Sequence, residues 1–372
     1  MRIVFVLQYY HPYVGGLESL FRHLAEGLVR RGHTVSVITT QLRGTAPLET
    51  INGVRVERVK TPHLADRYFF ILFSMAAAIR AARQSDLIHS TPYAGAIPAY
   101  FSARLSGKPV VFTALEVLGR RWFRVEANVM KAALYDLYEK LVYRLPYDRI
   151  AAISQATLED AVALGIDVRH GRVIYCGVDE QFSRAPGRLT LRVQLGLAAG
   201  DFIYLYYGRP GITKGVDVLL RAAPQIHAAV PNAHLVLLLS EEPRLQFEKM
   251  QRLAVSLDRD ACIHFIASVP RADLTSVLSD ANCVVVPSLT EGFGLTTAEA
   301  CTLGVPVVAT HAGSIPEVIS GRHILVEPDS STALAEGVIR ISKGEWQETP
   351  LKTFSWDSMV DAYEKLYQEL LA

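Results

Sequence analysis

The feature that most constrains the fold of this chain is a repeated alternation of short apolar segments with segments of helical periodicity. Ile3 to Leu7 is an apolar run rich in β-branched residues, which is typical of a strand. Leucines then recur at helical spacing from Leu17 to Leu28, and a second strand-like run covers Val35 to Thr39. This order predicts a βαβ unit at the beginning of the chain.

The same alternation continues over most of the chain. In the first half we expect further strands at 54–59, 87–89, 110–113, 149–153 and 173–175, and helices at 68–83, 94–105, 126–144 and 155–164. In the second half we expect strands at 202–207, 233–239, 262–266, 283–287 and 307–309, and helices at 216–230, 243–256, 273–280, 297–303 and 356–371. Apolar strands that alternate with helices predict parallel sheets covered on both faces.

A break in this pattern at residues 183–200, which contains Pro186 and several glycines, predicts a linker between two domains. The predicted fold is therefore α/β, with two tandem doubly wound, Rossmann-like domains facing across a cleft. We expect an N-terminal domain over residues 1–183, a C-terminal domain over 184–355 and a last helix, 356–372, that returns to the first domain. Ligands of such folds bind beyond the carboxyl ends of the strands.

The charge of the chain is nearly balanced overall but unevenly divided. The net charge of +1 argues against a nucleic-acid binder that relies on bulk charge. Residues 1–180 contain 22 Lys and Arg against 16 Asp and Glu, whereas the remaining residues contain 16 against 21. A basic first half suits an anionic membrane or an anionic acceptor, and a chance scatter of solvated charges is the alternative.

A second sign of membrane contact is the segment Arg120 to Arg124, which mixes cations with aromatic residues. The helix expected after it carries Tyr135, Tyr138 and Tyr143. This combination is typical of an interfacial membrane element, and an ordinary loop followed by a core-facing helix is the alternative. On the first interpretation the N-terminal domain associates peripherally with a membrane.

The cysteines and the start of the chain bear on location. The four cysteines, at positions 176, 262, 283 and 301, lack paired metal-ligand spacing and predict buried thiols in a reducing compartment. The first seven residues fit a strand better than a signal peptide, and the longest uncharged stretch, 68–79, is shorter than the ~20 residues of a spanning helix. We expect a cytoplasmic protein, peripheral at the inner membrane face on the interpretation above.

Two loops are candidates for phosphate binding. Gly15 and Gly16 precede a helix whose first N–H groups are free to bind an anion, although a plain turn is the favoured explanation of the glycines taken alone. Arg209 and Lys214 follow a predicted strand, where Arg can chelate phosphate oxygens and Lys acts as a point charge. Cations at that position stabilise the charge that builds on a departing diphosphate. Solvated loop charges are the alternative.

The third candidate is the segment from Glu291 to Glu299, which follows a buried strand. Gly292 and Gly294 flank exposed backbone at a helix start, where N–H groups can bind a phosphate or a hydroxyl. Carboxylates are strong acceptors for sugar hydroxyls. Because the two glutamates are eight positions apart, each can reach a different part of a long ligand.

With these motifs, the chain resembles a retaining glycosyltransferase of the GT-B fold, in family four (glycosyl transferases group 1). The resemblance runs almost from end to end, and it covers the segments 9–17, 176–182, 208–217, 287–306 and 313–317. Its most specific part is the combination of Arg209 and Lys214 with the pair Glu291 and Glu299.

The resemblance implies a role for each matching residue. Arg209 and Lys214 hold the donor diphosphate, Glu291 binds hydroxyls of the transferred sugar, and Glu299 binds the ribose. Backbone amides of 292–295 contact sugar and phosphate, and the glycine pair closes on the donor or the acceptor. The implied donor-binding residues are Gly15, Gly16, Arg209, Lys214, Glu291, Gly292, Phe293, Gly294, Leu295 and Glu299, of which Arg209, Lys214 and Glu291 are the catalytic ones. No cofactor and no metal are implied.

The chain also departs from the family pattern. Leu115 stands where the family often has a His that contacts the donor, Cys176 where Asn is usual, and Ser240 where Gly is common. His89 ends a predicted strand. It is either a ligand-binding residue that faces the cleft or a structural residue. Asp258-Arg-Asp260 resembles the metal motif of the other glycosyltransferase fold, but we expect it on the surface.

The reaction implied by the resemblance is retaining transfer of a hexosyl unit from a UDP- or GDP-linked sugar to an acceptor hydroxyl. We expect same-face attack with the leaving phosphate as base, a glycan or lipid-linked acceptor, and a role in glycan or glycolipid synthesis. Two alternatives stay open, namely a sugar-nucleotide epimerase on the same fold and a non-catalytic, nucleotide-sugar-binding subunit of a glycan assembly complex.

Overall fold

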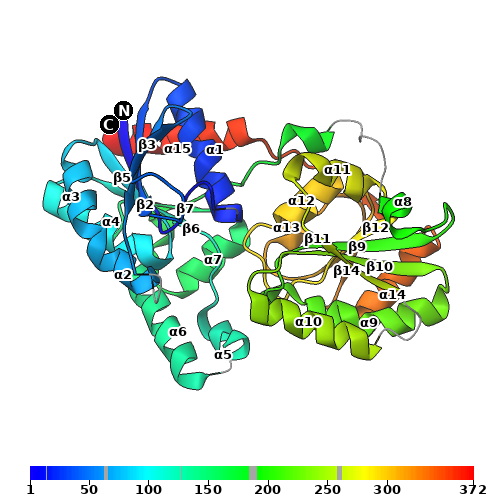
Figure 1. The fold of residues 1–372 in the computed structure, drawn as a ribbon. Helices are drawn as coiled ribbons and strands as arrows, with labels where there is room; N and C mark the ends of the chain where they lie inside the picture. The colour runs from blue at the N-terminus through cyan, green and yellow to red at the C-terminus, as the bar shows by residue number, and fades with distance from the viewer. Residues whose placement is uncertain (14, 63–65, 127, 184–190, 258–261) are drawn as a thin grey trace. The chain divides into compact units, whose positions relative to one another are not determined.

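A computed structural model describes residues 1–372 apart from 14, 63–65, 127, 184–190 and 258–261. The chain forms two compact units (Figure 1). The N-terminal unit comprises Met1–Gly177 together with Ser355–Ala372, and the C-terminal unit comprises Val178–Phe354. The sequence had placed these boundaries at residues 183 and 355. The motif at 258–260 and much of the predicted linker lie outside the described residues.

The N-terminal unit is built on an eight-stranded sheet. Its strands are β1 Arg2–Val6, β2 Thr34–Thr40, β3 Leu48–Ile51, β4 Val54–Val59, β5 Leu87–Ser90, β6 Val110–Ala114, β7 Arg149–Ala152 and β8 Gly171–Val173. They lie in the order β3-β4-β2-β1-β5-β6-β7-β8, and all neighbours are parallel except β3 and β4. The order of the strands reverses between β1 and β5, which makes their carboxyl ends the switch point of this sheet.

Helices cover both faces of this sheet. They are α1 Gly16–Arg30, α2 Asp66–Phe73, α3 Met75–Arg83, α4 Ala96–Ser106, α5 Trp122–Val125, α6 Val129–Tyr143, α7 Gln155–Ala163 and α15 Trp356–Leu371, with 3-10 turns η1 Tyr93–Gly95, η2 Gly119–Arg121 and η3 Val168–His170. A buried apolar cluster from strands and helices, including Val6, Phe112 and Tyr143, fills the space between the layers.

The last helix, α15, packs beside α1 in the N-terminal unit (Figure 1). The contact is close because a Cβ on Gly27 of α1 would lie 2.6 Å from the Val360 side chain. Arg31 also pairs with Asp361 at 2.6 Å. Glycine at position 27 therefore lets the two helices approach, and α15 completes the N-terminal layer.

The C-terminal unit is built on a seven-stranded sheet. Its strands are β9 Phe202–Gly208, β10 Ala233–Leu239, β11 Ile263–Ala267, β12 Cys283–Val286, β13 Val307–Thr310, β14 Gly321–Val326 and β15 Gln347–Thr349. Their order is β11-β10-β9-β12-β13-β14-β15, with only β15 antiparallel to its neighbour. The switch point of this sheet therefore lies between β9 and β12.

The helices of this unit are α8 Leu191–Leu195, α9 Val216–Ala229, α10 Arg244–Leu257, α11 Arg271–Ser279, α12 Leu295–Thr302, α13 Ile315–Val318 and α14 Ser331–Ser342, with 3-10 turns η4 Glu180–Ser183 and η5 Ile212–Lys214. Its core is apolar and continuous between the sheet and α9, α10 and α14. The prediction of two Rossmann-like α/β domains is confirmed by these two largely parallel sheets.

Several predicted elements need correction. The single helix expected at 68–83 is two helices, α2 and α3, that meet at the buried Ser74. The strand expected at 173–175 is β8, which ends at Val173. Strands β14 and β15 and helix α14 were not predicted, and α8 lies in the segment that was predicted as a linker. Within the described ranges, no helix is both long and apolar enough to cross a bilayer.

Candidate active site

Most of the predicted site residues gather at the switch point of the C-terminal sheet. The loop after β9 carries Arg209 and Lys214, and the loop after β12 carries Glu291 and the glycine-rich segment. Carboxyl ends of adjacent parallel strands lie at one edge of a sheet, so these two loops are neighbours there. The strand order thus explains how residues about eighty positions apart in the sequence meet.

The two loops are held together by backbone contacts. The Leu289 N–H donates to the carbonyl of Thr213 at 2.7 Å. Gly215 has a φ of +63°, and a Cβ at this position would lie 2.0 Å from the Pro287 carbonyl oxygen. Only glycine fits this conformation and this approach without a shift of the backbone. The spacing of the two loops is therefore fixed before any ligand arrives.

Lys214 and Glu291 form an ion pair across these loops. The Lys214 Nζ lies 2.9 Å from each Glu291 carboxylate oxygen. The Ser288 hydroxyl donates to Glu291 Oε2 at 3.1 Å. Both charged side chains remain partly exposed, so a ligand can reach the cation and the carboxylate at the same place.

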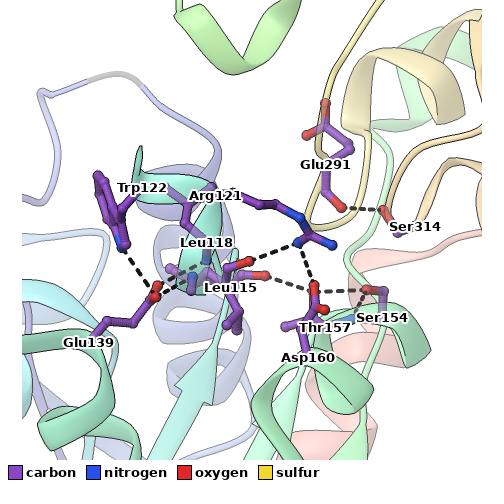
Figure 2. Close-up of polar contacts among 12 residues, drawn as sticks. Leu115, Leu118, Arg121, Trp122, Glu139, Ser154, Thr157, Asp160, Glu291 and Ser314 are labelled. Carbon is purple, nitrogen blue, oxygen red and sulfur yellow. Dashed lines mark hydrogen bonds and ion pairs between the residues drawn. The ribbon is translucent and has the colours of Figure 1, made fainter. Parts of the chain in front are cut away.

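The backbone of Glu291 is anchored as firmly as its side chain. Its carbonyl accepts hydrogen bonds from the Ser314 N–H at 3.1 Å and from the Ser314 hydroxyl at 3.2 Å, and Figure 2 draws the contact between these two residues. Gly313, with a φ of +50°, makes this approach possible because a Cβ there would lie 2.3 Å from the Glu291 carbonyl oxygen. The motif at 313–317 thus holds Glu291 through its backbone carbonyl.

The glycine-rich segment leads into a helix with an open N-terminus. Gly292, Phe293 and Gly294 are buried, and Gly294 has a φ of +89° as the N-cap of α12, which begins at Leu295. No side chain caps this helix. The first N–H groups of a helix have no intrahelical partner and carry partial positive charge, so this N-terminus can bind a phosphate or a hydroxyl.

Arg209 differs from Lys214 in having an exposed side chain. Its backbone carbonyl accepts a hydrogen bond from the Tyr206 hydroxyl at 3.0 Å, which fixes the start of the loop. In the part of the chain that the structure describes, its guanidinium has no recorded ion-pair partner. Arg209 is therefore the exposed cation of this loop, whereas Lys214 is held in place by Glu291.

Glu299 occupies a very different environment, because its side chain is only 2% exposed. Its carboxylate accepts a hydrogen bond from the Tyr207 hydroxyl at 2.9 Å and forms an ion pair with Arg271. Burial raises the pKa of Glu299, and the charge of Arg271 opposes that rise. A ligand that binds the Glu299 carboxylate must therefore do so beside the Arg271 guanidinium, which already pairs with it.

Arg271 is a residue that the sequence analysis missed. It begins α11, directly beyond the carboxyl end of β11, and it also pairs with Asp179 at 2.6 Å. Its guanidinium lies 5.3 Å from the centre of the Phe182 ring. A cation just beyond a parallel strand is the same sequence signal that indicates Arg209.

The N-terminal unit holds the other predicted residues. Gly15 caps α1 and Gly16 is its first residue, so both lie in the loop that follows the switch-point strand β1. A Cβ on Gly15 would lie 2.3 Å from a carboxylate oxygen of Glu18, a contact that a flexible side chain can relieve. Leu115 is buried just after β6, where its carbonyl accepts a hydrogen bond from the Thr157 hydroxyl at 2.8 Å (Figure 2).

His89 is structural in this fold. It is fully buried, and its ring nitrogens lie 2.6 Å from the Tyr367 hydroxyl and 2.7 Å from the Thr113 hydroxyl. The Thr113 hydroxyl in turn lies 2.8 Å from the Tyr363 hydroxyl. These contacts fasten β5 and β6 to α15, so of the two interpretations of His89 the structural one holds.

Metal ligation has no obvious place in the described part of the chain. Among those residues, no group of three or more His, Cys, Asp or Glu side chains is arranged to hold a metal ion. All four cysteines are free and buried.

Comparison with known proteins adds to this geometry. The family model described as Glycosyltransferase Family 4 matches residues 14–182, and the model described as Glycosyl transferases group 1 matches residues 188–353. A D-inositol 3-phosphate glycosyltransferase of Corynebacterium jeikeium is 29% identical, over 96% of this chain and 92% of that protein.

Two solved structures are similar in fold. Sucrose-phosphate synthase from Thermosynechococcus elongatus has a TM-score of 0.78 at 20% identity, covering 99% of this chain and 98% of that one. The Anabaena protein HepE, in complex with UDP-glucose, has a TM-score of 0.75 at 20% identity, covering 100% and 98%. At this identity the likeness concerns the fold.

Proposed function

We propose a reaction for this chain from one premise: it belongs to the group 1 glycosyltransferases and is itself a glycosyltransferase. The proposed reaction is transfer of a hexosyl unit, with retention of configuration, from a nucleotide diphosphate sugar to an acceptor hydroxyl. The UDP-glucose bound by the Anabaena protein HepE makes a UDP-linked sugar the first donor to test. GDP-linked sugars are the second.

The observation that carries this proposal is the Lys214–Glu291 pair beside the open N-terminus of α12. A donor diphosphate needs cations where its terminal phosphate departs, and Lys214 together with the exposed Arg209 supplies them. A sugar needs acceptors for its hydroxyls, and the Glu291 carboxylate lies directly beside that cation. The two halves of a nucleotide sugar thus find complementary groups within one pair of loops.

The remaining roles follow from position. The backbone amides from Gly292 to Leu295 bind phosphate or sugar oxygens at the helix start. Glu299, one helical turn further on, binds the ribose while it shares its carboxylate with Arg271. The leaving phosphate acts as the base for same-face attack, and no metal takes part. Gly15 and Gly16, in the N-terminal unit, contact the donor or the acceptor.

The acceptor is proposed to be a hydroxyl on a glycan or a lipid-linked molecule. The name of the Corynebacterium relative points to an inositol phosphate as a further acceptor to test. The basic N-terminal half supports peripheral association with a membrane, and free, buried thiols support a cytoplasmic location at its inner face.

The test is a panel of UDP- and GDP-sugars offered to the purified full chain. A true donor binds only the native state and raises its melting temperature. For each donor that does so, mass spectrometry then follows the products with inositol phosphate, glycan or lipid-phosphate acceptors. Release of nucleoside diphosphate with a glycosylated acceptor supports the proposal, whereas an isomerised donor sugar with no transfer would contradict it.

A further inference from the structure

The N-terminal unit holds an apolar pocket that none of the roles above uses. Its volume is about 110 Å³, well above the ~10–15 Å³ on the same measure that a single water needs. The pocket is walled by α2, the turn after β5, α5 and α6. The residues that matter most are Tyr68, Ile71, Tyr93, Trp122, Leu134 and Tyr135. Apolar pockets take up apolar groups of ligands.

One wall of this pocket is held by polar contacts of Glu139, which itself lines the pocket. The Glu139 carboxylate accepts hydrogen bonds from the N–H of Leu118 at 3.0 Å and from the indole N–H of Trp122 at 3.2 Å (Figure 2). The Trp122 ring packs against Tyr135, with ring centres 5.1 Å apart. Glu139 is therefore satisfied, and it holds the aromatic wall in one position.

Tyr93, which lines the pocket, has a strained backbone conformation. Tyr93 has a φ of +75°, which is unusual for any residue other than glycine. Its carbonyl accepts a hydrogen bond from the Tyr138 hydroxyl at 2.7 Å. Strain of this kind collects at functional sites. This turn follows β5, so the pocket borders the switch point of the N-terminal sheet.

Helix α6 also carries apolar side chains on the surface beside the pocket. Met130, Leu134, Leu137 and Leu141 recur at helical spacing and are exposed, with fractions from 82% for Met130 to 54% for Leu137. These four residues form the α6 apolar stripe. The opposite side of the helix is buried as well, through residues such as Val142 and Tyr143. A surface helix normally presents polar residues outward, so this stripe marks an interaction site.

The charges near the stripe are mostly positive. Arg120, Arg124 and Lys131 are exposed, whereas the carboxylates of Asp136 and Glu139 are buried and bonded to Lys140 and to the loop at 118–122. A stripe that pairs with a second helix usually has charges of both signs beside it. Exposed cations beside apolar and aromatic side chains instead fit anionic phospholipids.

We propose that the α6 apolar stripe lies in the headgroup region of an anionic phospholipid bilayer and that the pocket takes up part of one acyl chain. Arg120 and Arg124 contact the lipid phosphate, and Trp122 and Tyr135 border the chain. The inference rests on the proposed peripheral membrane association and gives it a defined site. It does not involve the charged site of the C-terminal unit.

Vesicle binding tests the surface. The full chain is sedimented with vesicles of phosphatidylcholine alone and with vesicles that also contain phosphatidylglycerol. We expect binding to the anionic vesicles only, at least tenfold weaker for Leu137→Glu and for Arg120→Ala combined with Arg124→Ala. Val255→Glu is the matched control, because Val255 is an 82% exposed apolar residue on α10 in the other unit. It should bind as the wild type does.

Fluorescence quenching tests the pocket. Phospholipids with brominated acyl chains quench a tryptophan that lies beside the chain, so they should quench part of the wild-type emission. Trp122→Phe should lose that part at vesicle concentrations that saturate both proteins, because the remaining tryptophans, Trp346 and Trp356, do not line the pocket. Quenching that is unchanged in Trp122→Phe would place the acyl chain outside the pocket and overturn this part of the proposal.

Other outcomes separate the proposals. Equal binding of Leu137→Glu and wild type, or a concentration-dependent dimer that Leu137→Glu dissolves, would overturn the lipid site. Thermal stabilisation by the donor should be the same in Leu137→Glu and the wild type. If no donor stabilises either protein while vesicle binding persists, the proposed transferase reaction fails and the lipid site stands.

Discussion

The two units share an architecture but use their polar residues in opposite ways. Each has a largely parallel sheet whose order reverses once, between β1 and β5 in one and between β9 and β12 in the other. Behind the N-terminal switch point, His89 is part of a buried network of neutral groups. At the C-terminal switch point, Lys214 and Glu291 form a partly exposed ion pair.

This difference between neutral and charged groups indicates a different role for each sheet edge. Neutral hydrogen-bonded groups can be buried at little cost when every partner is present, and they then fix one arrangement of the core. Charged pairs gain little stability because desolvation opposes their attraction. The charged edge of the C-terminal unit is therefore better explained by a charged ligand than by stability. This contrast leads to four predictions, which are ordered from the largest to the smallest expected change in unfolding or activation free energy.

The largest effect is expected where the two charged loops touch. Gly215→Ala puts a Cβ 2.0 Å from the Pro287 carbonyl oxygen at a φ of +63°. We expect a loss of about 4 kcal/mol in unfolding free energy, from the left-handed conformation and the overlap together. Gly107→Ala in the N-terminal unit is the matched control, because Gly107 has the same φ of +63° with nothing within 4 Å.

Gly107→Ala should cost only about 1 kcal/mol, since conformation alone is affected. Urea denaturation of both variants measures the difference. Equal losses in the two would mean that the loop contact at Pro287 adds nothing to the stability of the C-terminal unit.

The second prediction concerns turnover. Lys214→Ala and Glu291→Ala should each reduce the transfer rate at least tenfold while the fold stays intact. A loss near a hundredfold, about 3 kcal/mol in the barrier, is expected if Lys214 stabilises the charge of the leaving diphosphate. Glu336→Ala, at an exposed position on α14, is the control. Near-normal turnover in either site variant would contradict the assigned roles.

The third prediction concerns Arg271. Arg271→Ala leaves Glu299 buried without its cation, which should lower the unfolding free energy by about 2 kcal/mol, less than for a fully buried pair because the Arg271 side chain is 46% exposed. The KM for the donor should rise as well. Adding Glu299→Gln removes the unpaired charge and should restore most of the stability but not the KM. A stable single variant with a normal KM would argue that the Arg271 contact is incidental.

The fourth prediction concerns the neutral network. Burial lowers the pKa of His89 from its ordinary value of 6.5 to about 3. Between these values the unfolded chain binds a proton that the folded chain does not, so stability is retained above pH 6.5 and falls as the pH drops. From pH 7.5 to 5.5 the loss should be about 1.4 kcal/mol. His89→Gln should be less stable at pH 7.5 but lack this component, and an unchanged pH slope would contradict the burial argument.

Much of the fold follows from the sequence because its signals are local. The last helix was predicted at 356–371, the bounds it has, since its apolar residues keep one helical spacing. The division of α2 from α3 at Ser74 was not visible, because the alanines on both sides keep the same helical pattern. Helix α14 was not predicted, although Ser330 is a local N-cap signal at its start.

The site was only partly predictable for a different reason. Arg209, Lys214 and Glu291 lie in loops whose composition is unusual enough to be noticed. The contacts of Arg271 with Glu299 and Asp179 join residues 28 and 92 positions apart, and the spatial order of the strands determines them. No spacing in the chain encodes that order, so a local pattern cannot reveal such a partner.

The return of α15 to the N-terminal unit has a consequence for how the protein is made. A ribosome synthesises residues 356–371 only after the whole C-terminal unit, so the N-terminal unit cannot complete its core during synthesis of its own first part. Until then His89 and Thr113 lack the hydroxyls of Tyr367 and Tyr363. A nascent chain that stops before α15 therefore leaves uncovered the side of α1 that this helix packs against.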